Sequence, residues 1–329
     1  MRAGPLACRE FEGVPVAIHP YLDDSARADR WSGGARRIPV ATPAGEFSVW
    51  TKRVGNNPDL KVLLLHGGPA VPSTYWECVD SYFPAAGIEY YYYDQLGTYR
   101  SDQPEDDRLW TAERYVDEVE QVRRALGLDS SNFVLMGHSW GGVLAIEYAL
   151  AHQENLKGLV ISNMMSSIPA YNDYARRVLM PAMDPQKLAR VQELEAAGDV
   201  AHPDYESLLH EIHYVHHVLR RPVAEWPDPV QRAFAHANQY VYTLMQGPSE
   251  LGASGRLVEW DRTEDLARID VPALVVGARH DTMDPDFLET MARRLPQGRS
   301  HICPEGSHMA MYDDQDDYFA AVIDFLESL

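Results

Sequence analysis

Short apolar runs alternate with longer, helix-like segments along the first half of the chain. Each apolar run is short enough for a buried strand and ends at turn-forming residues such as Gly, Pro, Asn or Asp. A hairpin is predicted from two further strands, 38–42 and 46–54, around a Pro-Ala-Gly turn. The other predicted strands are 61–65, 88–93, 133–136 and 159–162, and the predicted helices are 111–126 and 143–150.

Strands that alternate with helices predict a mostly parallel sheet with helices on both faces. Right-handed crossovers then bring the carboxyl ends of the parallel strands to one edge of the sheet. Binding and catalytic groups gather at that edge in sheets of this kind. We therefore look for chemistry in the loops that directly follow the predicted strands.

The alternation stops after residue 162, and the next convincing strand is 273–277. This gap is far longer than one crossover needs, and it is mostly helix-like. A last strand, 299–303, and a closing helix, 316–329, follow it. The predicted organisation is an N-terminal extension (1–35), a first part of an α/β core (36–165), an inserted helical cap (166–255) and a second part of the core (256–329).

The sequence around Ser139 combines a strand, a sharp turn and a helix. Gly137-His138-Ser139-Trp140-Gly141 has the Gly-x-Ser-x-Gly pattern and lies between the predicted strand 133–136 and helix 143–150. This context is the one that a nucleophile elbow requires, with the serine hydroxyl exposed above the sheet. A Cβ atom at either flanking glycine would clash in so tight a turn. We therefore predict that Ser139 is a nucleophile.

A serine nucleophile needs a base and a carboxylate that orients the base. In proteins with such an elbow, the acid and then the histidine follow the serine along the chain, each after a strand. Asp281 follows the predicted strand 273–277, and His308 follows 299–303, so both are expected at the same edge as Ser139. The competing residues are Asp284 for the acid and His280 or His301 for the base.

The oxyanion of an acyl-transfer reaction needs two backbone N–H donors. One is expected from Trp140, the residue after the serine. The other is expected from the loop His66-Gly67-Gly68-Pro69, where glycines allow close approach to a substrate oxygen. We assign Gly68 as this donor and keep Gly67 as its alternative and as a substrate-contacting residue.

The composition narrows the choice of partners. The 329 residues carry a formal net charge of −20, which disfavours nucleic acid as a partner. No apolar run reaches the length that a bilayer span needs, so we expect no membrane association. Three cysteines are few and odd in number, which favours a reducing, cytoplasmic compartment without a disulfide framework.

Histidines in the predicted cap raise the question of a metal site. The segment His210-Glu211-x-His213 continues to His216 and His217, but it lacks the His-Glu-x-x-His spacing of zinc proteases. His213 and His217 are four residues apart, yet no Glu follows His213. A polar helix face explains the pattern better, and we predict neither a metal nor another cofactor.

Several segments together resemble the proline iminopeptidase family of α/β-hydrolases, which includes prolyl aminopeptidases and amino-acid amidases. The resemblance extends from about residue 38 to the C-terminus. It implies an α/β-hydrolase fold with a helical cap. The matching segments are His66-Gly67-Gly68-Pro69, Asp94-Gln95-x-Gly97, Gly137-x-Ser139-Trp140-Gly141, Trp226-Pro227, Tyr242-x-x-Met245-x-Gly247-Pro248-x-Glu250, Leu257-x-x-Trp260-Asp261 and the Asp281/His308 pair.

The resemblance implies a carboxylate that holds the free amino group of the substrate, and Glu250 occupies the matching position. Many relatives have a second Glu that anchors the amine, directly after the catalytic Asp. This chain has Thr282 at that position. Glu206 or Glu211 in the cap are alternatives for that second anchor. Ala70 and Tyr99 each replace a family glycine. We expect the ring of Tyr99 to narrow the substrate pocket.

The resemblance thus implies a serine hydrolase that cleaves the amide bond after an N-terminal residue, in a short peptide or amino-acid amide. An alternative is an esterase, thioesterase or lactonase on the same scaffold, which Thr282 favours. A non-catalytic binding protein is a further alternative, which the presence of all three triad residue types disfavours.

Overall fold

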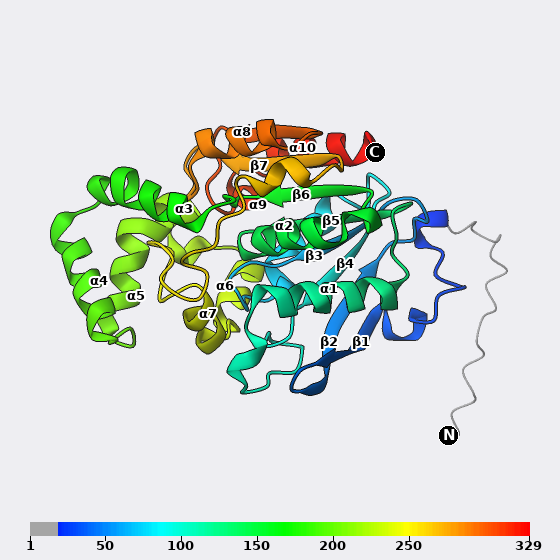
Figure 1. Cartoon of the computed structure of the whole chain (residues 1–329), viewed down its shortest axis with the longest axis horizontal. Coiled ribbons are helices and arrows are strands. Elements are labelled where there is room, and N and C mark those ends of the chain that lie inside the picture. Colours follow the sequence, from blue (N-terminus) through cyan, green and yellow to red (C-terminus); the bar gives the residue numbers. More distant parts are fainter. Residues whose placement is uncertain (1–18) are drawn as a thin grey trace, which may run out of the picture.

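Eight strands form one sheet in the computed structural model, which describes residues 19–329. The strand order is β1-β2-β4-β3-β5-β6-β7-β8, and all neighbours from β4 to β8 are parallel, whereas β1 and β2 form an antiparallel hairpin at one end (Figure 1). The strands are β1 (Ala35–Thr42), β2 (Gly45–Val54), β3 (Lys61–Leu65), β4 (Glu89–Asp94), β5 (Phe133–His138), β6 (Gly158–Ser162), β7 (Ala273–Ala278) and β8 (Gly298–Cys303).

Each predicted strand is therefore present, with ends shifted by three residues at most. The central strands are buried along almost their whole length, as expected for a sheet that is covered on both faces. Alternate residues divide between two hydrophobic cores: Leu63 and Leu65 belong to one core, and Val62 and Leu64 to the other. The two-residue period of a strand accounts for this division.

Helices cover both faces. The core that contains Leu63 also includes residues of α1 (Ala112–Leu126), α2 (Trp140–His152) and α8 (Pro285–Arg294). The opposite core is built with the 3-10 segment η3 (Ser73–Ser81), α9 (Ala310–Asp313) and α10 (Gln315–Glu327). Helix α1 begins where the sequence predicts, because the Thr111 side chain caps the backbone N–H of Arg114.

Strand β4 contains four consecutive tyrosines, all buried. Their hydroxyls donate to carboxylates: Tyr90 and Tyr92 to Asp80, Tyr91 to Glu89, and Tyr93 to Glu118. A buried phenol without a partner would be costly, so these carboxylates make a tyrosine-rich central strand possible.

A helical segment separates β6 from β7 and lies beyond the end toward which β6 points (Figure 1). It has a small core of its own, in which Val191, Leu194 and Leu209 are buried. Its longer helical pieces are α3 (Ile168–Tyr174), α4 (Pro185–Ala197), α5 (Pro203–Leu209), the π-helix η8 (His210–Val218), α6 (Asp228–Ala235) and α7 (Gln239–Met245).

Part of the predicted extension, residues 1–18, lies outside the described residues. Residues 19–34 pack against the core through Tyr21, whose buried hydroxyl donates to the carbonyl of Ile88. Arg53 adds an ion pair with Asp29 at 2.9 Å, and both side chains are almost fully buried. The described part of the extension is therefore anchored beside β2 and β4.

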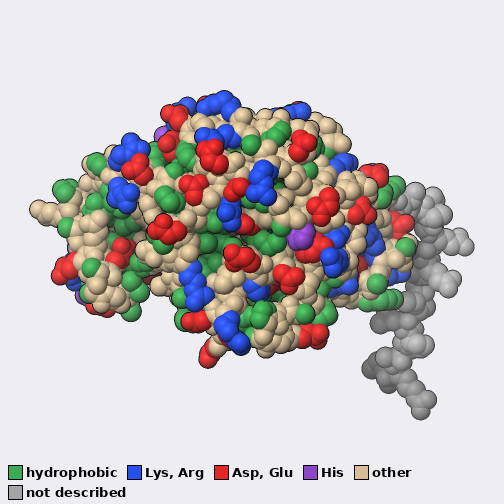
Figure 2. All heavy atoms as spheres, viewed as in Figure 1, with side chains coloured by type: hydrophobic (Ala, Val, Ile, Leu, Met, Phe, Trp, Pro, Cys, Tyr) green, Lys and Arg blue, Asp and Glu red, His purple; other side chains and the backbone are tan. Residues whose placement is uncertain are grey.

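Between residues 19 and 329, no helix is both long enough and apolar enough to cross a membrane. Acidic and basic side chains are interspersed on the face drawn in Figure 2. That face therefore presents no broad basic surface of the kind that binds a nucleic acid backbone.

Candidate active site

Ser139 stands at the sharp turn between β5 and α2. Its backbone has φ 54° and ψ −125°, a conformation that is unusual for a residue other than glycine. A Cβ atom on Gly137 would lie 1.9 Å from the carbonyl oxygen of Gly141, and one on Gly141 would lie 2.3 Å from that of Leu65. The predicted clash at both flanking glycines is confirmed, since in each case the nearest atom belongs to the backbone.

Asp281 and His308 form a buried pair. Asp281 follows β7 and His308 follows β8, and the Nδ1–H of His308 donates to Oδ1 of Asp281 over 2.8 Å. The carboxylate also accepts from the side-chain amide of Asn163 at 2.7 Å and from the backbone N–H of Met283 at 3.2 Å. These donors, together with the Thr282 hydroxyl at 3.2 Å, fix the carboxylate, which in turn fixes one ring nitrogen of the imidazole.

The two side chains shift each other's protonation. Burial opposes a charge on His308, but the adjacent Asp281 carboxylate outweighs it, with help from Glu250, so the pKa of His308 is raised. Burial also opposes a charge on Asp281, yet His308 and the hydrogen bonds from Asn163 and Met283 lower the pKa of that carboxyl. The pair therefore stabilises a protonated imidazole beside an ionised carboxylate.

The competing residues have other roles in the structure. Asp284 caps α8 by accepting from the backbone N–H of Asp286. His301 pairs with Asp317 within 2.6 Å. The backbone N–H of His280 donates to Gly306, and its side chain faces a different cavity. Of the predicted acids and bases, Asp281 and His308 are the two that lie together.

The loop after β3 places two glycines beside the serine. The N–H of Gly67 already donates to the hydroxyl of Tyr75, at 2.6 Å. Within the described part of the chain, the N–H groups of Gly68 and Trp140 have no hydrogen-bond acceptor. Gly68 and Trp140 therefore fit the predicted donor pair better than Gly67 does.

A second buried histidine links this loop to His308. The hydroxyl of Tyr75 accepts from Gly67, so it donates to Nδ1 of His138, at 3.1 Å. The Nε2–H of His138 then donates to the backbone carbonyl of His308, at 2.8 Å. Burial lowers the pKa of His138 to about 3, which keeps this ring neutral. The chain of hydrogen bonds positions the glycine loop and the His308 loop relative to each other.

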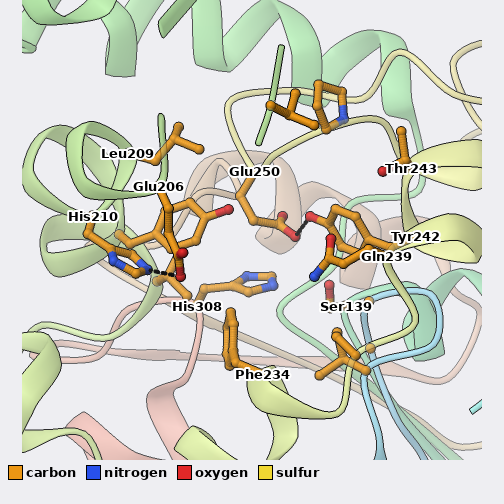
Figure 3. A pocket seen from close by; sticks show the side chains of 18 of the residues that line it. Ser139, Glu206, Leu209, His210, Phe234, Gln239, Tyr242, Thr243, Glu250 and His308 are labelled. Atoms are coloured by element: carbon orange, nitrogen blue, oxygen red, sulfur yellow. Dashed lines mark hydrogen bonds and ion pairs between the residues drawn. The ribbon is translucent and has the colours of Figure 1, made fainter. Parts of the chain in front are cut away.

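Ser139, His308 and the glycine loop open into a cavity of about 490 Å³ between the core and the helical segment. No direct hydrogen bond joins Ser139 to His308 in the structure, although both face this cavity (Figure 3). Such contacts are often long before a substrate is bound. Most of the lining is aliphatic or aromatic, including Val71, Tyr205, Leu209, Tyr214, Val218, Phe234, Tyr242 and Met309.

Two carboxylates interrupt this apolar lining (Figure 3). Glu250 is half-buried, and its Oε1 accepts from the Tyr242 hydroxyl at 2.5 Å. Glu206 lies on the other side of the His308 ring, 4.0 Å from His210, and its side chain is 83% exposed. A cation held near His308 would interact more strongly with Glu250, because that carboxylate is the more enclosed of the two.

Comparison with known proteins decides the family. The α/β hydrolase fold family matches residues 61–315. A proline iminopeptidase of Elizabethkingia meningoseptica is 52% identical over 294 residues, covering 89% of this chain and 98% of that protein. One of Flavobacterium johnsoniae is 51% identical over 292 residues, with the same coverage. The crystal structure of a Mycobacterium smegmatis proline iminopeptidase has a TM-score of 0.78 at 29% identity, covering 89% of this chain and 98% of that one. The chain belongs to the proline iminopeptidase family of α/β hydrolases.

We expected the ring of Tyr99 to narrow the substrate pocket, but the structure places the ring outside the cavity. This ring packs at a tilt against His236, with ring centroids 4.1 Å apart, and the residue is 37% exposed. It is not among the residues that line the cavity, so it does not narrow it. The 94–101 loop turns the ring outward, where Arg100 also packs against it.

Thr282, at the position of a second family Glu, is fully buried and does not line the cavity. Its hydroxyl lies 3.2 Å from both Asp281 Oδ1 and His308 Nδ1. Of the two cap alternatives, Glu206 reaches the cavity, whereas Glu211 pairs with Lys187 outside it. In this chain, therefore, the residue at position 282 contacts the Asp281–His308 pair and does not face the cavity.

The cap histidines do not converge on one point. His213 is buried and hydrogen-bonded to the Glu250 carbonyl, at 2.9 Å, and His217 is bonded to the carbonyl of His280. His210 pairs with Glu206. His210, His213 and His217 therefore each have a partner of their own.

Several residues at this family site carry no motif that sequence analysis could use. Asn163 follows β6 at the active edge, so its position in the strand order was the only signal for it. Tyr75 and His138 act through hydrogen bonds to residues far away in the sequence: Tyr75 is bonded to His138, and His138 to the backbone carbonyl of His308. Only the tertiary structure brings these partners together.

The contact at the elbow predicts a large effect of Gly137→Ala. We expect it to lower the free energy of unfolding by at least about 3 kcal/mol, the upper end of overpacking costs, because backbone atoms block the new methyl group. Gly87→Ala is the control, since its φ is +68° but nothing lies near the added Cβ, and it should cost about 1–2 kcal/mol. Urea denaturation measures both, and equal losses would contradict the elbow contact.

The Asp281–His308 pair predicts a titration that nitrogen NMR of the imidazole can follow. We expect His308 to titrate above its usual 6.5 in the native protein. Asp281→Asn should lower the titration midpoint, because burial alone then favours the neutral ring. Glu250→Gln should also lower the titration midpoint of His308. A native midpoint below 6.5, or one that Asp281→Asn leaves unchanged, would contradict the assignment.

Proposed function

We propose that this protein is a serine aminopeptidase that removes one N-terminal residue from a short peptide or amino-acid amide. The observation that carries this proposal is the convergence of Ser139, the Asp281–His308 pair and Glu250 on one apolar cavity. Membership of the proline iminopeptidase family favours peptidase over esterase activity. The helical segment, which we assign to residues 166–255, is the cap that closes this cavity.

The geometry supports acyl transfer through a covalent intermediate. His308 takes the hydroxyl proton of Ser139 on Nε2, and Ser139 Oγ bonds to the carbonyl carbon of the substrate. The N–H groups of Gly68 and Trp140 donate to the oxyanion that forms. His308 then gives the proton to the departing amine as the amide bond breaks. A water molecule attacks the acyl-enzyme by the same route and releases the free N-terminal residue.

Asp281 keeps Nδ1 of His308 protonated, which leaves Nε2 as the base. The same carboxylate stabilises the imidazolium that appears in each step. Its hydrogen bonds from Asn163 and Met283 keep it aimed at the ring. These roles follow from the order of the side chains: the buried carboxylate of Asp281 lies behind the ring of His308, and His308 and Ser139 face the cavity.

Glu250 gives the site its selectivity for a free amine. A protonated N-terminal amine is a cation, and a half-buried carboxylate in an apolar cavity binds it more strongly than water does. The hydrogen bond from Tyr242 orients that carboxylate. Glu206 adds negative charge at a more exposed position in the same cavity. The absence of a second Glu at position 282 therefore does not remove the anchor.

The ester alternative drew its support from Thr282, as the mark of a lost amine anchor. The Thr282 side chain is buried against Asp281 and His308 and does not reach the cavity. Its identity therefore says nothing about how the substrate amine is held, and we do not propose ester substrates as the principal ones.

The first test compares proline and alanine anilides with free and acetylated amines. We expect acetylation to lower kcat/KM by about 10- to 100-fold, the value of a hydrogen bond to a charged group. Ser139→Ala should reduce kcat by about 10⁵-fold or more. Equal cleavage of free and acetylated anilides, or near-normal turnover by Ser139→Ala, would overturn the proposal.

The second test assigns the amine anchor. Glu250→Gln should lower kcat/KM for free-amine anilides by about 10- to 100-fold and leave acetylated anilides almost unaffected. Glu211→Gln is the matched control, since Glu211 is a cap carboxylate outside the cavity, and it should change neither. Glu206→Gln removes the more exposed carboxylate of the cavity, and its effect is compared with that of Glu250→Gln in the same assay. If Glu206→Gln removes amine selectivity and Glu250→Gln does not, Glu206 is the anchor.

A further inference from the structure

A cluster outside the cavity combines three metal-binding side-chain types. His301 and Cys303 are two residues apart on β8, so their side chains point to the same face of the strand. Asp317, in the first turn of α10, lies over that face and is 2.6 Å from Nε2 of His301. One ligand atom from each residue lies within 4.8 Å of the other two, and no other such group of three or more occurs among residues 19–329.

The three side chains come from one strand and one helix. The strand, β8, is the last in the sheet order, and the helix is α10. Cys303 is fully buried in the core beneath α10, whereas the side chains of His301 and Asp317 are 33% and 39% exposed. A cation can therefore approach from solvent across His301 and Asp317 and meet the sulfur at the closed end.

The local charge favours a cation. The chain has an overall charge of −20, and the carboxylates of Asp313, Asp314 and Asp317 lie near Cys303. Asp313 and Asp314 are engaged with the loop that follows β8, where they accept from the backbone N–H groups of Ser307 and Glu305. Asp317 is the carboxylate that faces the cluster, where its hydrogen-bond partner is His301.

We propose that His301, Cys303 and Asp317 bind a borderline-soft transition-metal dication of the Zn²⁺ type, with solvent as the fourth ligand. Imidazole nitrogen, thiolate sulfur and carboxylate oxygen are the ligands that zinc takes in proteins, usually in tetrahedral geometry. Binding breaks the S–H bond of Cys303 and releases its proton to water, and a sulfur–metal bond forms in its place. No electron is transferred.

The position of the site gives it a structural consequence. β8 and α10 flank the loop 304–309, which carries His308, and the short helix α9. A metal that joins His301 and Cys303 to Asp317 closes a bridge between the two ends of that segment. The bound form should therefore resist unfolding better than the metal-free form, and the stabilisation should rise with the logarithm of the free metal concentration once that exceeds the Kd.

Cobalt(II) is the probe, because a thiolate ligand gives it a sulfur-to-cobalt charge-transfer absorption band. The chain has three cysteines, and the variant with Cys8→Ser and Cys78→Ser keeps only Cys303. We expect that variant to bind one Co²⁺ with the band, and Zn²⁺ to displace it. Cys303→Ser alone should abolish the band although it retains Cys8 and Cys78.

His301→Gln keeps the proposal testable if a change at the buried Cys303 disturbs folding, because the His301 side chain is partly exposed. It should weaken Co²⁺ binding by at least about tenfold, since changes around a metal site typically cost 10- to 100-fold. The midpoint of thermal unfolding should rise with Zn²⁺ in the Cys303-only variant and not in Cys303→Ser. Absence of the band in the Cys303-only variant, or its persistence in Cys303→Ser, overturns the proposal.

Discussion

The close approach of α2 to the ends of β3 and β5 is the constraint on which the site depends. It requires glycine at 137 and 141, because backbone carbonyls lie where their side chains would start. The turn between them forces Ser139 into an unusual backbone conformation and turns it toward the cavity. The same approach brings the glycine loop after β3 beside the N-terminus of α2, so the proposed nucleophile and the proposed oxyanion donors are positioned by one packing contact.

Two adjacent histidines show how the surroundings divide chemical roles. The rings of His138 and His308 lie 4.8 Å apart, and both are buried. His138 has a phenol and a backbone carbonyl as partners, so burial dominates and the ring stays neutral. His308 has an ionised carboxylate as its partner, so its pKa is raised. One histidine can therefore hold the loops in place while the other exchanges protons.

The cavity combines apolar walls with few carboxylates, and this contrast gives the charges their weight. The ion pair that we propose between a substrate amine and Glu250 would be stronger where aromatic side chains exclude water than on the surface. The helical segment supplies most of the apolar walls and both carboxylates, whereas loops at the edge of the sheet supply the groups that we assign to bond cleavage. Changes in the cap can therefore alter substrate choice while the reaction stays the same.

The sequence by itself determined the strand and helix order, the mostly parallel sheet, and the elbow with its two glycines, because these depend on local periodicity and turn chemistry. It also placed Ser139, Asp281 and His308 at one edge, since that follows from strand order. Only the tertiary structure decided that Tyr99 turns outward, that Thr282 supports the Asp281–His308 pair and that Glu206 reaches the cavity. The physical reason is that the direction of a loop side chain is set by partners distant in the sequence, which no local pattern records.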